Sequence, residues 1–247
     1  MPAFVNQTAS FGGIYGLNTT GSVAFSSLTD LDTLLNAGSD ATGHWFLGSS
    51  IQGSYTNAVL APAADGVFRL GGGGGILTLT QTNVLVGGTA MMIGAEKGNG
   101  TGAVAFLAPQ AFTGNTVVAS GSTLMLSSRS DATNVTTTLI VTPNTTITGR
   151  GRLLIETRQA CGAYGAIEVR GVTNFTGPIE LIGTAGSGNK LLIEHGASIP
   201  AVAEKITIMT NATLFTRNVL SSPIFVGGAG NGEGYGALRV SASLLGP

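Results

Sequence analysis

The chain has 247 residues, of which 43% are hydrophobic and 9% are charged, and its formal net charge at pH 7 is −1. Disordered chains combine low hydrophobicity with high net charge, so this composition excludes disorder; a typical soluble domain has about 25% charged residues. The 11 basic residues are scattered singly, apart from Arg150 and Arg152, so the chain lacks the positive stripe that nucleic-acid binding requires. The composition predicts a folded protein with a nearly neutral surface, and nucleic acid is not expected as a partner.

Targeting and redox signals are sparse along the chain. No apolar run approaches the roughly 18 to 20 residues of a membrane span, and residues 1–7 lack the basic start and apolar middle of a signal peptide. Cys161 is the only cysteine, which excludes internal disulfides and a cysteine-rich metal site. We therefore expect no membrane span, and we interpret Cys161 as a small buried side chain.

Residues 1–60 differ in pattern from the rest and are predicted to form an irregular N-terminal cap. Within them, Ser27–Gly38 places four leucines on one face of a short helix, with Ser27 as its N-cap and Gly38 as its stop signal. His44–Leu47 contains the only tryptophan, which suits an aromatic plug over an exposed core. A cap is expected because the open end of a repeat array needs a cover.

Residues 61–247 are predicted to form the repeats. From about Val67 onward, short apolar runs of period two are each closed by Gly, Asn or Pro, which is typical of β-strands. The clearest runs are Ile76–Leu79, Val104–Phe106, Leu124–Leu126, Leu139–Val141, Leu153–Ile155, Ile167–Val169, Ile179–Leu181, Leu191–Ile193, Ile206–Ile208 and Leu238–Val240. Strands this short suit either an antiparallel sandwich or a parallel β-solenoid.

An internal repeat favours the solenoid. The blocks Thr101-Gly-Ala-Val104, Tyr164-Gly-Ala-Ile167 and Tyr235-Gly-Ala-Leu238 place their glycines 63 and 71 residues apart. A sandwich gives no reason for that interval. In a solenoid with coils of about 21 to 24 residues, three turns bring the chain back to the equivalent position, and neighbouring coils lie about 4.8 Å apart. We therefore predict an all-β fold, a parallel β-solenoid with a small N-terminal cap containing one short helix.

The scarcity of charge fits such a stack. Equivalent positions of successive coils lie over each other, so a Lys or Glu repeated in every coil would lie next to a residue of the same charge and be repelled by it. Thr, Ser and Asn can instead hydrogen-bond along the stack. The first two blocks are followed by Phe112-Thr-Gly114 and Phe175-Thr-Gly-Pro178, and the third by Leu245-Gly-Pro247, where this copy of the repeat stops in mid-motif. A nearly neutral surface also favours association. We expect a segment of a longer repetitive protein or a subunit that self-associates end to end.

Several blocks resemble the passenger-associated repeats of bacterial autotransporter-like surface proteins. These blocks share Gly, Thr and aliphatic residues at loose spacing and are Gly165–Ile179, Gly75–Asn83, Gly87–Thr89 and Gly121–Leu126. The resemblance covers roughly residues 65–247 and implies a right-handed parallel β-helix on the cell exterior, used as an adhesin, stalk or scaffold. The chain departs from the pattern at Leu85–Gly87 and Leu244–Gly246, where an aromatic-Thr-Gly sequence is expected.

Two glycine-rich runs invite a ligand-binding interpretation. Gly71–Gly75 lacks a following Gly-Lys-Ser/Thr and leads into a strand instead of a helix, which favours a tight corner over a phosphate loop. Gly227–Gly236 superficially resembles calcium-binding nonapeptide turns, but those require Asp where Gly232 stands. Neither run is predicted to hold a phosphate or a metal.

Three glutamates form the one pattern that suggests catalysis. Glu156, Glu168 and Glu180 are spaced by 12 residues, and Arg158 and Arg170 follow the first two at the same offset. Clustered carboxylates serve as acid and base in polysaccharide-cleaving β-helices. With coils of about 24 residues, however, Glu156 and Glu180 stack while Glu168 lies across the solenoid, so an outward ladder relieved by arginine is the favoured interpretation.

The remaining candidates form no recognised motif. His44 and His195 are the only histidines and have no motif partner, so no catalytic, cofactor-binding or metal-binding residue and no cofactor are predicted. Five Asn-x-Ser/Thr sequons begin at Asn6, Asn18, Asn134, Asn144 and Asn211, and they carry sugar only in a host that glycosylates.

The function predicted first is a non-enzymatic, extracellular or cell-surface β-helix with a structural or adhesive role. It would form a repeat segment or a self-associating subunit of a bacterial surface filament, stalk or adhesin, with a surface glycan or host ligand as a further partner class. The alternative is a phage or viral fibre, or a tailspike-like β-helix that binds or cleaves carbohydrate. One Trp and four Tyr offer little surface for stacking sugars, which favours the first function.

Overall fold

The computed structural model describes most of the repeat region and parts of the N-terminal region. The described residues are 4–5, 12–17, 22–23, 44–56, 59–60, 62–63, 65–94, 101–108, 110, 112, 114–131, 134–136, 147–157, 166–169, 174–183, 190–193, 204–216, 220, 222–230, 234 and 236–240. The helix predicted over Ser27–Gly38 and the strand predicted over Leu139–Val141 lie outside these residues.

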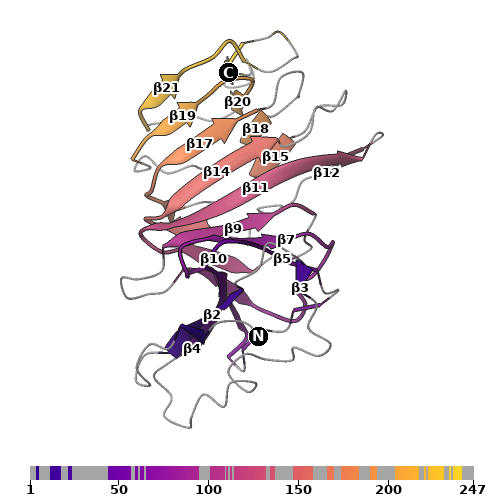
Figure 1. Ribbon diagram of the computed structural model, residues 1–247. Helices are drawn as coiled ribbons and strands as arrows, with labels where there is room; N and C mark the ends of the chain where they lie inside the picture. Colours follow the sequence, from indigo (N-terminus) through magenta and orange to yellow (C-terminus); the bar gives the residue numbers. More distant parts are fainter. Residues whose placement is uncertain are drawn as a thin grey trace.

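All regular structure in the described residues is β, and it forms three sheets (Figure 1). The eight-stranded sheet has the order β1 (Phe4–Val5), β2 (Gly12–Leu17), β4 (His44–Ser49), β6 (Val67–Leu70), β8 (Ala90–Ile93), β10 (Asn115–Val118), β13 (Ile147–Gly149) and β16 (Asn174–Phe175). The ten-stranded sheet has the order β3 (Ser22–Val23), β5 (Gln52–Tyr55), β7 (Ile76–Leu79), β9 (Gly102–Phe106), β11 (Ser122–Asp131), β14 (Arg152–Thr157), β17 (Ile179–Ile182), β19 (Ile206–Ile208) and β21 (Ile224–Val226), with β12 (Asn134–Thr136) beside β11. The four-stranded sheet contains β15 (Ala166–Val169), β18 (Lys190–Ile193), β20 (Thr213–Thr216) and β22 (Leu238–Val240).

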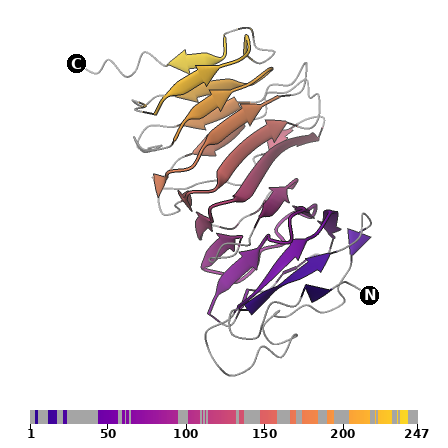
Figure 2. The same ribbon diagram turned by 60° about the vertical axis from the view of Figure 1, so that its left-hand side comes forward.

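The strands pair in parallel, and each step within a sheet is one coil of a β-solenoid. Only β1 with β2 and β11 with β12 pair antiparallel among the described strands. Figure 2 shows the coils following one another along the long axis of the molecule, from indigo at one end to yellow at the other. The predicted all-β parallel solenoid is confirmed.

Coil length varies more than the sequence predicts. The shortest step, from Ile208 to Val226, has 18 residues, and the longest, from Gly12 to His44, has 32. The predicted range of about 21 to 24 residues was therefore too narrow. Only the strands must keep register, so the connections between them are free to differ in length.

The internal repeat has a structural basis in one of its two intervals. Ile167 and Leu238 lie in one column of the four-stranded sheet, joined through β18 and β20, so their 71-residue interval spans three coils. Val104, the equivalent residue of the first block, lies instead in the ten-stranded sheet between β7 and β11. The shared Gly-Ala-aliphatic pattern therefore marks the start of a strand in either sheet.

Part of the predicted cap region continues the solenoid. Leu47 of β4 pairs with Leu70 of β6, and β5 pairs in parallel with β7 along its whole length. Residues 44–55 therefore add to the same sheets as the repeat region. At the outer edge of the eight-stranded sheet, the two-residue strand β1 lies antiparallel to β2.

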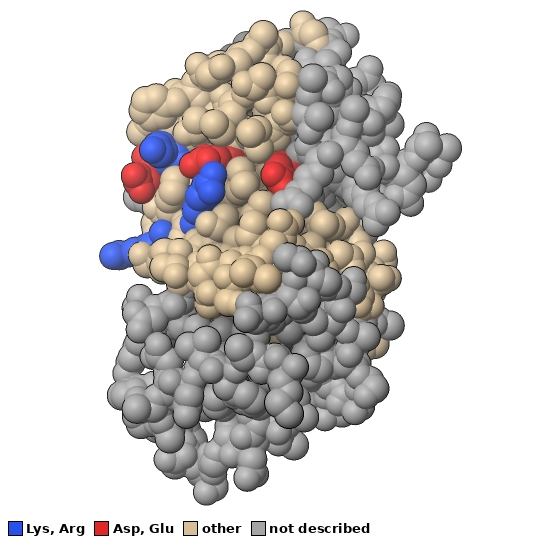
Figure 3. Space-filling view, in the orientation of Figure 1, with Lys and Arg blue, Asp and Glu red and all other residues tan. Residues whose placement is uncertain are grey.

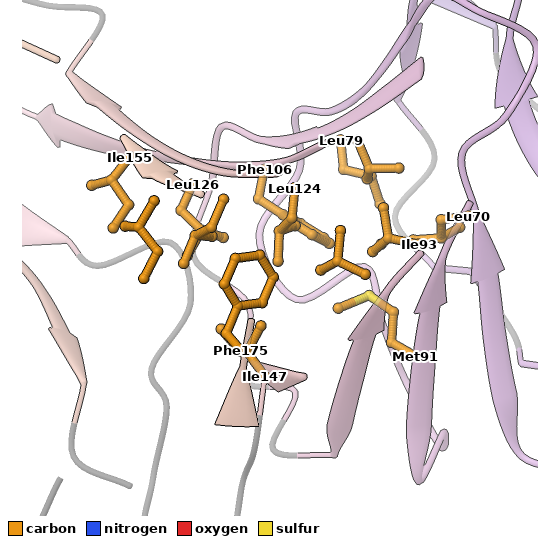
Figure 4. Close-up of a cluster of buried hydrophobic side chains, with 14 of the residues drawn as sticks. Leu70, Leu79, Met91, Ile93, Phe106, Leu124, Leu126, Ile147, Ile155 and Phe175 are labelled. Carbon is orange, nitrogen blue, oxygen red and sulfur yellow. The ribbon is translucent and has the colours of Figure 1, made fainter. Parts of the chain in front are cut away.

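The core is a set of inward-facing columns that run along the stack. Leu79, Phe106, Leu126 and Ile155 occupy successive coils of one column, and each is at most 1% exposed. Figure 4 shows these side chains meeting Phe175 and others from the opposite sheet. Every second residue of a strand faces inward, and burying one such side chain contributes about 1.5–3 kcal/mol.

Candidate functional site

The glycine run Gly71–Gly75 forms a corner between β6 and β7. Four consecutive glycines, Gly71 to Gly74, have φ between 81° and 95°, a region that other residues seldom adopt. The amides of Gly71 and Gly75 donate to the carbonyl oxygens of Leu47 and Ser49, at 2.7 Å and 2.8 Å. The amide of Gly74 also donates, to the carbonyl oxygen of Thr101 at 2.8 Å, so three amides of this run join neighbouring coils, as the corner interpretation predicted.

The second glycine run follows β21. The amide of Gly227 donates to the carbonyl oxygen of Ile208 at 2.8 Å, so this run also begins with a bond between coils. Within the described ranges, no group of three or more His, Cys, Asp or Glu side chains could hold a metal ion.

The glutamates do not stack in the way that their spacing predicts. Glu180 lies opposite Leu154, whereas Glu156 lies opposite Ile182, so the two glutamates are offset by two residues along neighbouring strands. The reason is a coil of 26 residues where about 24 were assumed. Glu168 lies on β15 in the four-stranded sheet, away from the other two, which agrees with the predicted separation.

Glu180 forms an ion pair with an arginine that the sequence analysis did not single out for this role. Arg152 Nη2 donates to Glu180 Oε2 at 2.5 Å, and the two side chains are 41% and 20% exposed. The arginines expected to relieve the ladder, Arg158 and Arg170, lie outside the described residues. Figure 3 shows the described charges gathered in a band over β14 and β17, within an otherwise neutral face.

This ion pair is expected to contribute little to stability. We expect Arg152→Gln, Glu180→Gln and the double variant each to change the free energy of unfolding by about 1 kcal/mol or less, because water screens a partly exposed pair. Loss of Arg152 also removes its buried Nε, which has no hydrogen-bond partner in the structure. Urea unfolding in a double-mutant cycle measures the coupling, and a coupling above about 2 kcal/mol would contradict a surface role.

The other candidate residues are mostly beyond what the structure describes. His44 lies on β4, whereas His195 and Cys161 fall outside the described residues. The sequon residues Asn6, Asn18 and Asn144 are also outside them, and Asn134 begins β12.

Asn211 is the sequon residue whose side chain is described, and it has a structural role. Its φ is 57°, and its Nδ2 donates to the carbonyl oxygen of Gly183 at 3.5 Å. The hydroxyl of Thr213, the third residue of this sequon, is buried and donates to the carbonyl oxygen of Gly236 at 2.9 Å. Asn211 thus serves as a corner residue that tolerates left-handed φ, and its sequon is built into the contact between coils.

Gln110, a buried side chain that joins two coils, belongs to no pattern that marks it in the sequence. Its Oε1 accepts hydrogen bonds from the amides of Val84 and Leu85, at 2.8 Å and 3.4 Å. Its Nε2 donates to the carbonyl oxygens of Gln81 and Ala108, at 2.8 Å and 3.1 Å. Gln110 is 4% exposed, and its amide bonds four backbone groups, three of them in buried contacts.

Comparison with known proteins gives no match among family models, curated proteins or solved structures. Among the described residues, no helix is long and apolar enough to cross a membrane. The architecture of the coils is therefore the basis for a functional proposal.

Proposed function

We propose that the chain is a non-enzymatic, extracellular structural or adhesive β-solenoid. In this proposal it forms a segment or subunit of a bacterial surface filament, stalk or adhesin, as the resemblance to autotransporter-like repeats implies. The observation that supports the proposal is that polar groups which could bind a ligand instead form hydrogen bonds between coils. The amides of Gly71, Gly74 and Gly75 and the side chain of Gln110 bond to neighbouring coils.

The outward face of the ten-stranded sheet supports the same proposal. Thr78, Ala105, Met125 and Leu154 follow one another in one outward column, and each is at most 8% exposed. A repeated charge in such a column would face its like in the next coil, whereas small and apolar residues pack closely. This face favours rigidity along the stack, a property that a stalk or scaffold needs.

Surface accessibility tests the proposed location. We expect a protease or a specific antibody added to intact cells that make the protein to reach it without breaking the membrane. Fractionation of the same cells with a cytoplasmic marker supplies the control. Protein found only in the cytoplasmic fraction, and protected from external protease, would overturn an extracellular role.

A carbohydrate-cleaving role is the second candidate, and one observation favours it. Glu156 and Glu180 lie on neighbouring strands of one outward face, as acid and base groups do in enzymes that cleave polysaccharides. Against it, Arg152 already pairs with Glu180. Binding to a glycan array distinguishes the structural role from the carbohydrate-cleaving role. For the structural or adhesive role, we expect either no glycan binding or binding that Glu156→Gln and Glu180→Gln leave unchanged.

A further inference from the structure

A β-hairpin extends beyond the ten-stranded sheet. β11 pairs with β9 as far as Leu126 and with β14 as far as Ser128, so its last residues, Arg129 to Asp131, pair only with β12 among the described strands. Figure 1 shows β11 running past the ends of β9 and β14, with β12 beside its far end. The hairpin therefore lies outside the stack of paired coils that holds the solenoid together.

The second strand of this hairpin is a glycosylation sequon. β12 is Asn134–Thr136, and its sequence Asn-Val-Thr fits Asn-x-Ser/Thr with a residue other than proline at x. Asn134 pairs with Asp131, and two residues separate them in the sequence, so Asn134 lies at the closed end of the hairpin. A two-stranded hairpin of three residue pairs is marginally stable, so the sequon can separate from β11 while the coils stay paired.

The sequon at Asn211 lies in the opposite situation. The Asn211 side-chain amide donates to the carbonyl oxygen of Gly183, and the Thr213 hydroxyl donates to the carbonyl oxygen of Gly236. Gly183 follows β17 and Gly236 precedes β22, so the two bonds reach the coil before and the coil after. Thr213 is 0% exposed. An enzyme can engage this sequon only after the three coils separate.

We propose that Asn134 is an acceptor site for N-linked sugar in the folded chain and that the fold closes Asn211 to the same reaction. The sugar donor is a lipid-linked oligosaccharide, and its transfer forms a bond between Nδ2 of Asn134 and C1 of the first sugar. The bond between C1 and the lipid pyrophosphate breaks, the pyrophosphate leaves with the bonding electrons, and one proton of Nδ2 passes to solvent. A bulky hydrophilic group at the end of the hairpin leaves the contacts between coils intact.

Transfer of sugar to the folded chain tests the proposal. The purified 247-residue chain and two synthetic peptides, one for each sequon, would be incubated with a eukaryotic-type single-subunit oligosaccharyltransferase and a lipid-linked oligosaccharide. Site-resolved mass spectrometry would measure the sugar on each Asn over time. We expect the folded chain to gain sugar at Asn134 nearly as fast as the Asn134 peptide. At Asn211 the folded chain should react about 100-fold or more slowly than the Asn211 peptide, because the coils must open first.

Substitutions assign the sugar to the hairpin sequon. Asn134→Gln and Thr136→Ala should each abolish modification of the hairpin, whereas Thr136→Ser keeps the hydroxyl and should retain it. Asn211→Gly is the matched control, because glycine suits the left-handed φ of 57° at that corner, and this variant should carry as much sugar as the wild type. Circular dichroism checks that each variant folds.

Three results would overturn the proposal. They are a folded chain without sugar on Asn134, equal slowing of Asn134 and Asn211 relative to their peptides, and modification that Asn134→Gln leaves unchanged. The acceptor site goes beyond the structural or adhesive role and does not depend on it, because the purified chain is tested outside any cell.

Discussion

Gly75→Ala is expected to destabilise the chain by about 4 kcal/mol or more, a loss that falls in the exceptional range for one substitution. The added Cβ would overlap the backbone carbonyl oxygen and nitrogen of Ile51 in the neighbouring coil. Neither atom can move without breaking the hydrogen bond that joins the amide of Ile76 to the oxygen of Ile51, at 2.8 Å. Urea unfolding followed by circular dichroism measures the loss.

The neighbouring glycines separate steric overlap from backbone strain. Gly74 has φ of +85° but open space where its Cβ would lie, so Gly74→Ala should cost only the left-handed strain of about 1–2 kcal/mol. Gly73 has φ of +81° and would also place its Cβ 2.7 Å from the carbonyl oxygen of Ser49. We expect Gly73→Ala to cost clearly more than Gly74→Ala. Equal losses at Gly74 and Gly75 would show that the corner is not packed as described.

The second large effect is expected at Gln110. Gln110→Met keeps the length of the side chain but leaves two amides and two carbonyl oxygens without the partner that the glutamine supplies. An unsatisfied buried polar group costs about 1–3 kcal/mol, so a total loss of about 3 kcal/mol or more is expected. Faster hydrogen exchange at the Val84 and Leu85 amides should accompany the loss, because these amides lose their acceptor.

Gln52→Met provides the matched control for Gln110→Met. Gln52 lies on β5 and is exposed, so the same chemical change there should alter stability by about 0.5 kcal/mol or less. A similarly small effect of Gln110→Met would contradict the role of Gln110 as a link between coils. Both variants can be compared with the wild type in one set of thermal and urea unfolding curves.

The fold could be predicted because its core repeats along the sequence. Runs such as Ile179–Leu181 and Ile206–Ile208 place aliphatic residues on the inward face, and these runs are strands in the structure. Strands such as Asn115–Val118 and Ile147–Gly149 were not among the runs singled out, because polar or glycine residues interrupt their apolar pattern. A strand of this kind is fixed by its neighbours above and below more than by its own residues.

The candidate residues were harder to predict for a related reason. The placement of Glu156 over Glu180 assumed coils of constant length, and a difference of two residues in one coil moved the glutamates out of register. The sequence around Gln110 did not indicate its role, because the backbone groups that it bonds lie up to 29 residues away in the sequence. Contacts between coils depend on the lengths of the connections, which no apolar periodicity specifies.

Release of reducing ends from polysaccharides tests most directly whether this solenoid is non-enzymatic. The wild-type chain and a Glu156→Gln, Glu180→Gln double variant would be incubated with a panel of bacterial surface polysaccharides, and new reducing ends would be measured over time. We expect both proteins to release no more than the buffer control. Release by the wild-type chain that the double variant abolishes would contradict a structural or adhesive role and establish a carbohydrate-cleaving enzyme.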